Sequence, residues 1–163
     1  MSSNEIQKLQ EGLRSAGEAV LSAIEGISEA EAREVPAPGE WTVAQLLGHV
    51  TEVQPFWVSK AILITREDDP NVARTAAEGE LRAASVAGDA QGNLADLRQR
   101  LIAANDAAVA SVGGIDPKDL GRVGHRGEGK SVTAGELIQS VASHLREHAG
   151  QIIETRRMVR ERQ

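Results

Sequence analysis

The sequence predicts an all-α protein built as a four-helix bundle, and three observations support this fold class. Over four long segments, apolar residues recur at spacings of three and four, the periodicity of amphipathic helices. Two of these segments begin with a threonine followed three residues later by glutamine or glutamate, the pattern of a helix-capping box. The alternation of strands and helices that marks a parallel sheet is absent. With 163 residues and no linker-like stretch, the chain is expected to form one domain over residues 1–163.

The first predicted helix covers residues 4–25 and presents an apolar stripe on one face. Gly26 lies near its end, and the stretch 36–39, with two prolines and a glycine, then interrupts the helical pattern. A short helical turn is expected before that interruption, at 28–33. The stripe consists of Ile6, Leu9, Leu13, Val20 and Ile24.

The second predicted helix covers residues 42–65, and Thr42 with Gln45 forms the first capping box. Pro55 lies inside this helix. Because proline lacks the N–H of a helical hydrogen bond, we expect a kink one turn beyond His49.

Residues 66–90 are expected to form a long connection that could include a short helix. The segment is acidic at first and then small and polar, with Leu81 and Val86 as its substantial apolar anchors. Loops of this length are uncommon in compact domains unless they lie over a site or cross the fold. Two alternatives therefore remain for the segment, a lid over the site and a solvated crossover.

The third and fourth predicted helices cover residues 93–112 and 133–160. Gly113 and Gly114 close the third, and Thr133 begins the fourth with a capping box completed by Glu136. The inward positions of the third helix are Leu94, Leu97, Leu101 and Ala108.

Three of the four histidines lie on the inward stripes of the second and fourth predicted helices. His144 and His148 are four residues apart, so both imidazoles leave the same helix face and should point into the core. His49 lies on the apolar face of the second helix. The neighbours on these faces are Leu137, Val141 and Ile152 for the pair, and Leu46, Val53 and Phe56 for His49.

These three imidazoles indicate a metal site. A single histidine on an apolar helix face is most often a structural residue of the core or the surface. Three that converge instead predict a divalent cation held by His49, His144 and His148, with zinc, nickel and iron all compatible with imidazole ligands. Three nitrogen ligands leave at least one coordination position open, which suits catalysis, although the catalytic residues stay undefined.

The open position allows two kinds of catalysis. In a transferase, the cation would hold an external thiol as thiolate for attack on an electrophile, since the chain has no cysteine. In a hydrolase, it would lower the pKa of bound water, with Glu147 as the candidate proton acceptor. The third alternative is a non-catalytic metal-binding stress or interaction protein whose ion organises the bundle.

Two short motifs match the sequence patterns of other functional sites, but the structural context that those sites require is absent. His144-Leu-Arg-Glu-His148 fits the H-x-x-E-H pattern of inverted zinc proteases, but few residues follow it and the third imidazole lies upstream. A surface ion pair is therefore the alternative role for Glu147. Residues 124–131 match the spacing of a phosphate loop, but no apolar strand precedes them. His125, inside this glycine-rich run, is expected in a loop near the mouth of the metal site.

Composition narrows the expected partners and environment. The net charge of −6 argues against nucleic-acid binding. No segment is apolar enough to span a membrane and the N-terminus lacks the features of a signal peptide, so a cytoplasmic protein without a membrane partner is expected. The basic residues near the C-terminus are expected to complement the dipole of the last helix. They are Arg156, Arg157, Arg160 and Arg162.

The chain has few aromatic residues, namely Trp41, Phe56 and Trp57. A pocket at the metal site is therefore expected to have aliphatic, small and charged walls, which weakens the case for an aromatic substrate. Trp57 is expected to belong to the core.

Three segments together resemble the DinB-like superfamily. They are 38–49, with Trp41 and the capped start of the second helix, 129–138, and 144–152, with its H-x-x-x-H-x-x-Q pattern. The resemblance implies up-down-down-up connectivity, a homodimer, and a divalent metal bound at His49, His144 and His148. The superfamily includes transferases and isomerases that use bacillithiol or mycothiol, proteins described as metal-dependent hydrolases, and members without known activity. This precedent favours a metal-dependent transferase whose partners are a small-molecule thiol and an electrophile.

Overall fold

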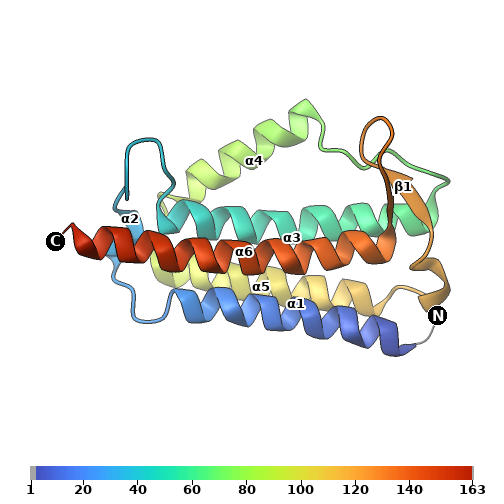
Figure 1. Ribbon diagram of the computed structural model, residues 1–163, viewed down its shortest axis with the longest axis horizontal. Helices are drawn as coiled ribbons and strands as arrows, with labels where there is room; N and C mark the ends of the chain where they lie inside the picture. The colour runs from blue at the N-terminus through green and yellow to red at the C-terminus, as the bar shows by residue number, and fades with distance from the viewer. Residues whose placement is uncertain (1–2, 163) are drawn as a thin grey trace.

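The computed structural model describes residues 3–162 and confirms the predicted four-helix bundle (Figure 1). Its four long helices are α1 (Ser3–Ala23), α3 (Val43–Arg66), α5 (Leu94–Gly113) and α6 (Ala134–Glu161). Both predicted capping boxes are formed at the starts of α3 and α6, and α3 continues through Pro55. The short turn before the proline-rich stretch is the five-residue helix α2 (Glu29–Arg33).

The helices follow the up-down-down-up connectivity. In Figure 1, α1 and α6 run in one direction and α3 and α5 in the other. Around the bundle, α1 packs against α5 and α6, and α3 packs against the same two helices. Since α3 and α5 are adjacent and parallel, the chain must travel back along the bundle before α5 can begin.

A fifth substantial helix, α4 (Ala76–Asp89), makes most of this return and packs on α3. At about 1.5 Å per residue, its 14 residues span about 21 Å, so the connection is far more regular than expected. Thr75 and Glu78 form a third capping box, a signal that the sequence already contained. Val86 is buried as expected, but Leu81 is 72% exposed and anchors nothing.

The connection from α5 to α6 also contains structure that was not predicted. The 3-10 helix η1 (Pro117–Asp119) precedes an antiparallel hairpin of β1 (Val123–His125) and β2 (Ser131–Thr133). Strands of three residues are too short to show an alternation of apolar and polar positions. Gly124 allows the hairpin to lie against α3, since a Cβ there would come within 2.8 Å of Ile64. The run that resembles a phosphate loop is thus a hairpin turn.

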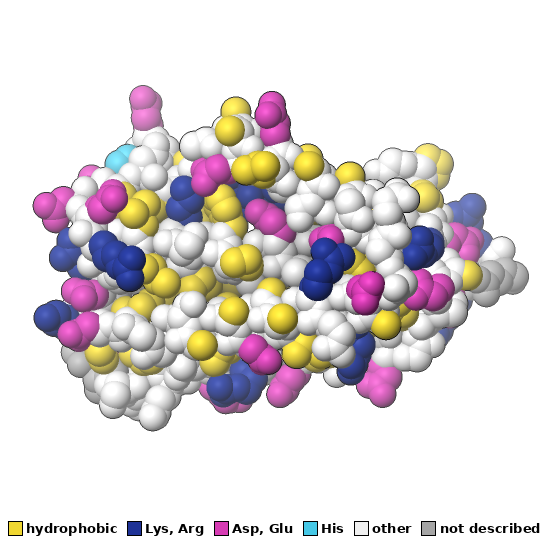
Figure 2. All heavy atoms as spheres, turned by 180° about the vertical axis from the view of Figure 1, so that it is seen from behind, with side chains coloured by type: hydrophobic (Ala, Val, Ile, Leu, Met, Phe, Trp, Pro, Cys, Tyr) yellow, Lys and Arg dark blue, Asp and Glu magenta, His cyan; other side chains and the backbone are white. Residues whose placement is uncertain are grey.

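Three of the C-terminal arginines bind the connection between α1 and α3. They hold α2 and its flanking loops against α6, so their charges are used within the molecule. On the face seen in Figure 2, positive and negative side chains are interspersed without a broad basic patch. No helix among the described residues is long and apolar enough to cross a membrane. The partners are the carbonyl oxygens of Ala23 and Glu25 for Arg156, the Glu31 carboxylate for Arg160, and the carbonyl oxygens of Val35 and Pro36 for Arg162.

The core contains one polar network among aliphatic side chains. Gln54 of α3 is fully buried, and its Oε1 accepts a 2.9 Å hydrogen bond from Asn105 Nδ2 of α5. The same amide donates to the Leu13 carbonyl of α1, and Gly17 leaves room for it there. Three helices are thereby held in one register, because a shifted helix would leave a buried amide without a partner. The predicted stripe of α1 is buried throughout: Ile6, Leu9, Leu13, Val20 and Ile24.

Replacing Asn105 by alanine is expected to lower the free energy of unfolding by about 1–2 kcal/mol, because Gln54 Oε1 loses its buried donor. Urea denaturation measures the change. Asp106→Ala, one position along on the exposed side of α5, is the control and should change stability by less than about 0.5 kcal/mol. Equal stability of the two variants would rule out a stabilising role for the network.

Candidate metal centre

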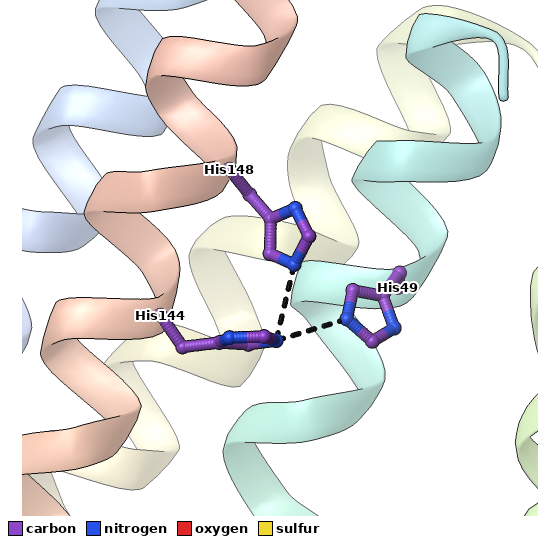
Figure 3. Close-up of side chains that lie close together, drawn as sticks. All are labelled: His49, His144 and His148. Atoms are coloured by element: carbon purple, nitrogen blue, oxygen red, sulfur yellow. Dashed lines mark hydrogen bonds between the residues drawn. The ribbon is translucent and has the colours of Figure 1, made fainter. Parts of the chain in front are cut away.

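The structure brings the three predicted histidines together between α3 and α6 (Figure 3). His144 and His148 project from successive turns of α6, and His49 faces them from α3. The Nε2 atom of His144 lies 3.1 Å from that of His49 and 3.0 Å from that of His148. Among the described residues, these form the one group of three or more histidine and acidic side chains that are close enough to share a cation.

This arrangement fits a metal ion better than it fits hydrogen bonds. A neutral imidazole nitrogen has either one hydrogen or one lone pair, so Nε2 of His144 cannot make two good hydrogen bonds at once. Nitrogen ligands of a tetrahedral zinc ion lie about 3.3 Å apart, given Zn–N distances of about 2.0–2.1 Å. The observed separations are close to that value. The three side chains could therefore hold a divalent cation.

The outer ring nitrogens have different surroundings. His148 Nδ1 lies 2.9 Å from Gln151 Oε1, which can accept its hydrogen and leave Nε2 free to bind a cation. His49 Nδ1 is buried and has no hydrogen-bond partner among the described residues. Glu147 lies 3.9 Å from His144 Nδ1, on the side of the ring away from the shared Nε2 atoms. The idea of Glu147 as a general base is therefore not supported by its position.

Burial differs among the three histidines. His49 is only 6% exposed, as expected for a core position. The side chain of His144 is 41% exposed and His148 is half-buried, so the α6 pair lies at the wall of a cavity instead of within the core. The cluster is thus anchored on α3 and open to solvent beside α6.

The pKa values favour neutral imidazoles. Burial is the main cause that lowers the pKa of His49 from 6.5 to about 3, and the charges of His148, His144, Arg82 and Arg74 act in the same direction. Burial, and then His148, also lowers the pKa of His144. Both rings therefore keep a free lone pair at neutral pH, as a metal ligand must.

The metal-free protein should lose stability as the pH falls from 7 to 5.5. In this window an unfolded histidine takes up a proton that folded His49 does not bind, so protonation favours the unfolded chain. The loss from this one group is about 1 kcal/mol. Urea denaturation at the two pH values measures it, and His49→Gln should show a smaller loss. An equal pH dependence in both proteins would contradict the assignment.

The histidines open into a cavity of about 450 Å³ whose walls are more aromatic than expected. Trp41 packs edge-on against His49, with ring centroids 5.4 Å apart. Half-buried Trp57 packs against the core as expected and also lines the cavity. Aliphatic, small and charged side chains line the cavity as expected, and two tryptophans lie beside them. The other lining residues are Val53, Arg74, Arg82, Arg126, Ser140, Val141 and Gln151.

The three arginines were missed by sequence reasoning because they come from connections. Arg74 precedes α4, Arg82 lies within α4, and Arg126 follows β1. No local pattern shows that these segments fold back over α3, so the sequence carried no direct signal for them. The connection 66–90 does contribute to the wall of the site, which agrees with the lid alternative in that respect.

His125 lies in β1 and not in the expected loop, and it does not line this cavity. It lines a separate hollow near the hairpin turn, and its Nδ1 lies 3.1 Å from Asp69 Oδ1. Successive side chains of an extended chain point in opposite directions, so the next residue, Arg126, lines the cavity of the three histidines instead. A larger cavity of about 660 Å³ lies between α1 and α6 and contains none of the histidines.

The connectivity of the bundle and the three-histidine cluster between α3 and α6 place the protein among four-helix bundles with a candidate metal site. The DinB superfamily model matches residues 13–152, and the chain belongs to that superfamily. No curated protein matches this chain in sequence.

Solved structures share the fold, among them the two that follow. YfiT from Bacillus subtilis, described as a probable metal-dependent hydrolase with an unusual four-helix bundle topology, has a TM-score of 0.78 and 16% identity, over 96% of this chain and 89% of that one. A mycothiol-dependent maleylpyruvate isomerase has a TM-score of 0.74 and 14% identity, over 93% of this chain and 63% of that one. The chain thus spans less than two thirds of the isomerase. At these identities the likeness establishes the fold alone.

Proposed function

We propose that the protein is a metal-dependent transferase that binds a low-molecular-weight thiol at the three-histidine site. The observation that carries this proposal is the open side of the cluster, which faces a cavity of about 450 Å³. When bound, a divalent cation would supply a Lewis acid that lowers the pKa of a thiol in its open coordination position. The likeness in fold to a mycothiol-dependent enzyme is compatible with this chemistry.

The residues of the chain would have distinct roles in such a reaction. His49, His144 and His148 hold the cation through Nε2, and Gln151 orients His148 by accepting its Nδ1 hydrogen. Trp41 covers one side of His49. In the transfer, a sulfur–carbon bond forms while the bond from that carbon to its leaving group breaks. The thiol proton goes to solvent, so the chain need not supply a general base.

Hydrolysis is the competing function, since one structural neighbour is described as a probable metal-dependent hydrolase. Activation of water requires a proton acceptor within hydrogen-bonding reach of the reacting atoms. No aspartate or glutamate is among the residues that line the cavity, and Glu147 lies beside the outer nitrogen of His144. The lining therefore favours thiol transfer over hydrolysis.

Cobalt substitution followed by 2-mercaptoethanol tests the proposal. The cobalt protein should develop a sulfur-to-metal charge-transfer band in the near-ultraviolet when the thiol is added. His49→Ala should bind little cobalt and show no band. If the wild-type protein binds one cobalt per chain but its spectrum does not change when the thiol is added, the transferase proposal fails. Hydrolysis or a structural ion then becomes the better explanation.

A further inference from the structure

Two arginines without an ion-pair partner among residues 3–162 line the cavity of the metal centre. Arg82 comes from α4 and Arg126 from the residue after β1, so two separate connections each bring one positive charge to the same cavity. Arg126 is exposed, but Arg82 is half-buried, and a half-buried guanidinium is normally paired with a carboxylate or held by hydrogen bonds. These two therefore have unused donors at a candidate binding site.

Arg74, the third arginine of the cavity, differs from these two because its charge is paired within the protein. Its Nη1 and Nη2 donate to the two carboxylate oxygens of Glu52 at 2.7 and 3.2 Å. Its guanidinium also lies 3.7 Å from the ring centroid of Phe56. Its charge is thus neutralised and its position fixed, which leaves Arg82 and Arg126 as the groups available to a ligand.

Trp57, in the wall of the cavity, orients Arg126 for binding an anionic ligand. The guanidinium of Arg126 lies 4.5 Å from the ring centroid of Trp57. Stacking uses the flat face of a guanidinium and leaves the N–H groups at its edge free to bind a carboxylate in a bidentate manner. Trp57 therefore restricts the orientation of Arg126 without using its donors.

The cavity is positively charged, whereas the whole protein is negatively charged. The chain has a net charge of −6, whereas no acidic residue lines this cavity. A bound divalent cation would add to the positive potential, so the cavity would attract an anionic ligand.

We infer that one of the two reactants carries an anionic group, a carboxylate in the simplest case, that Arg82 and Arg126 bind beside the three-histidine site. This inference rests on the proposed function and adds a substrate class to it. Shared recognition would give α4 and the hairpin, which pack at different parts of α3, a common role at this cavity. The anionic group belongs either to the thiol or to the electrophile, and binding measurements distinguish the two.

Three small thiols of similar size provide the first measurement on the cobalt-loaded, full-length protein. 3-Mercaptopropionate carries a carboxylate, 2-mercaptoethanol is neutral, and cysteamine carries an ammonium group. If the thiol is the anionic reactant, half-saturation of the charge-transfer band should occur at a concentration about tenfold lower for 3-mercaptopropionate than for 2-mercaptoethanol, with cysteamine weakest. Calorimetric titration of succinate into the 2-mercaptoethanol complex tests the other case, an anionic electrophile.

Variants assign the effect to the two arginines. Arg82→Ala and Arg126→Ala should each weaken the anionic probe by about tenfold and leave binding of 2-mercaptoethanol and one cobalt per chain unchanged. Arg82→Lys should restore part of the preference, because it keeps the charge but not the bidentate geometry. Arg98→Ala, on the exposed side of α5, removes the same charge away from the cavity and should have no effect.

The possible failures can be told apart. If no thiol changes the cobalt spectrum, the proposed transferase function fails. If all three thiols bind equally and succinate does not bind, the function survives and the inference of an anionic reactant is overturned. The inference also fails if Arg98→Ala weakens the anionic probe as much as Arg82→Ala does, because the effect would then come from net charge alone.

Discussion

His49→Ala should reduce the affinity for zinc by at least about a hundredfold. His49 is one of three Nε2 donors and the one that α3 supplies, so its loss leaves only the pair on α6. Even residues that merely orient metal ligands change affinity by about 10–100-fold when replaced, and a ligand should matter more. Competition with a chelating dye measures the affinity, and elemental analysis after dialysis gives the zinc bound per chain.

The fourth histidine provides the matched control. His125→Ala also removes an imidazole, but one that lies outside the cavity. The side chain of His125 is partly exposed and its Nδ1 lies beside Asp69. This variant should bind zinc with the affinity of the wild-type protein. Circular dichroism would show whether both variants remain helical. Weak zinc binding by both, with intact helices, would mean that the affinity does not depend on the predicted cluster.

Gly48→Ala should be among the most destabilising substitutions in α3, lowering the free energy of unfolding by about 2–3 kcal/mol. A Cβ at this position would lie 2.7 Å from Cβ of Asp89, near the end of α4. Asp89 is buried and paired with Arg100 of α5, so it cannot turn aside, and α4 must move away from α3. Urea denaturation measures the loss of stability.

Displacement of α4 should also affect the cavity, because Arg82 lies on this helix. The preference for 3-mercaptopropionate over 2-mercaptoethanol is therefore expected to fall in Gly48→Ala. Gly88→Ala is the control, since a Cβ there meets nothing within 4 Å. Alanine is a better helix former than glycine, so this control should be neutral or stabilised by up to about 1 kcal/mol. Gly48→Ala with wild-type stability would show that α3 and α4 are not in close contact.

The convergence of the three histidines was predictable because it depends on the local geometry of two helices. The spacing of His144 and His148 puts both rings on one face of α6, and the apolar neighbours of His49 direct it inward. The capping boxes likewise predict the residues at which α3 and α6 begin. Such signals depend only on helical geometry, so the sequence alone suffices to read them.

The rest of the cavity depends on tertiary structure. Arg82 and Arg126 reach the cavity because the parallel arrangement of α3 and α5 forces the chain back over α3, and because the hairpin lies against the end of that helix. Trp57 lies eight residues after His49, about 80° round the helix, which is the edge of the apolar stripe. A side chain at the edge of a stripe can face either the core or a cavity, and only the packing decides between them.

X-ray absorption spectroscopy of the zinc-loaded protein, with and without 2-mercaptoethanol, tests the central claim most directly. We predict three imidazole nitrogens at about 2.0–2.1 Å from zinc together with a position open to exchange, and a sulfur at about 2.3 Å once the thiol is added. A closed zinc site that gains no sulfur, or a spectrum without imidazole scattering, would contradict an open three-histidine centre for thiol chemistry.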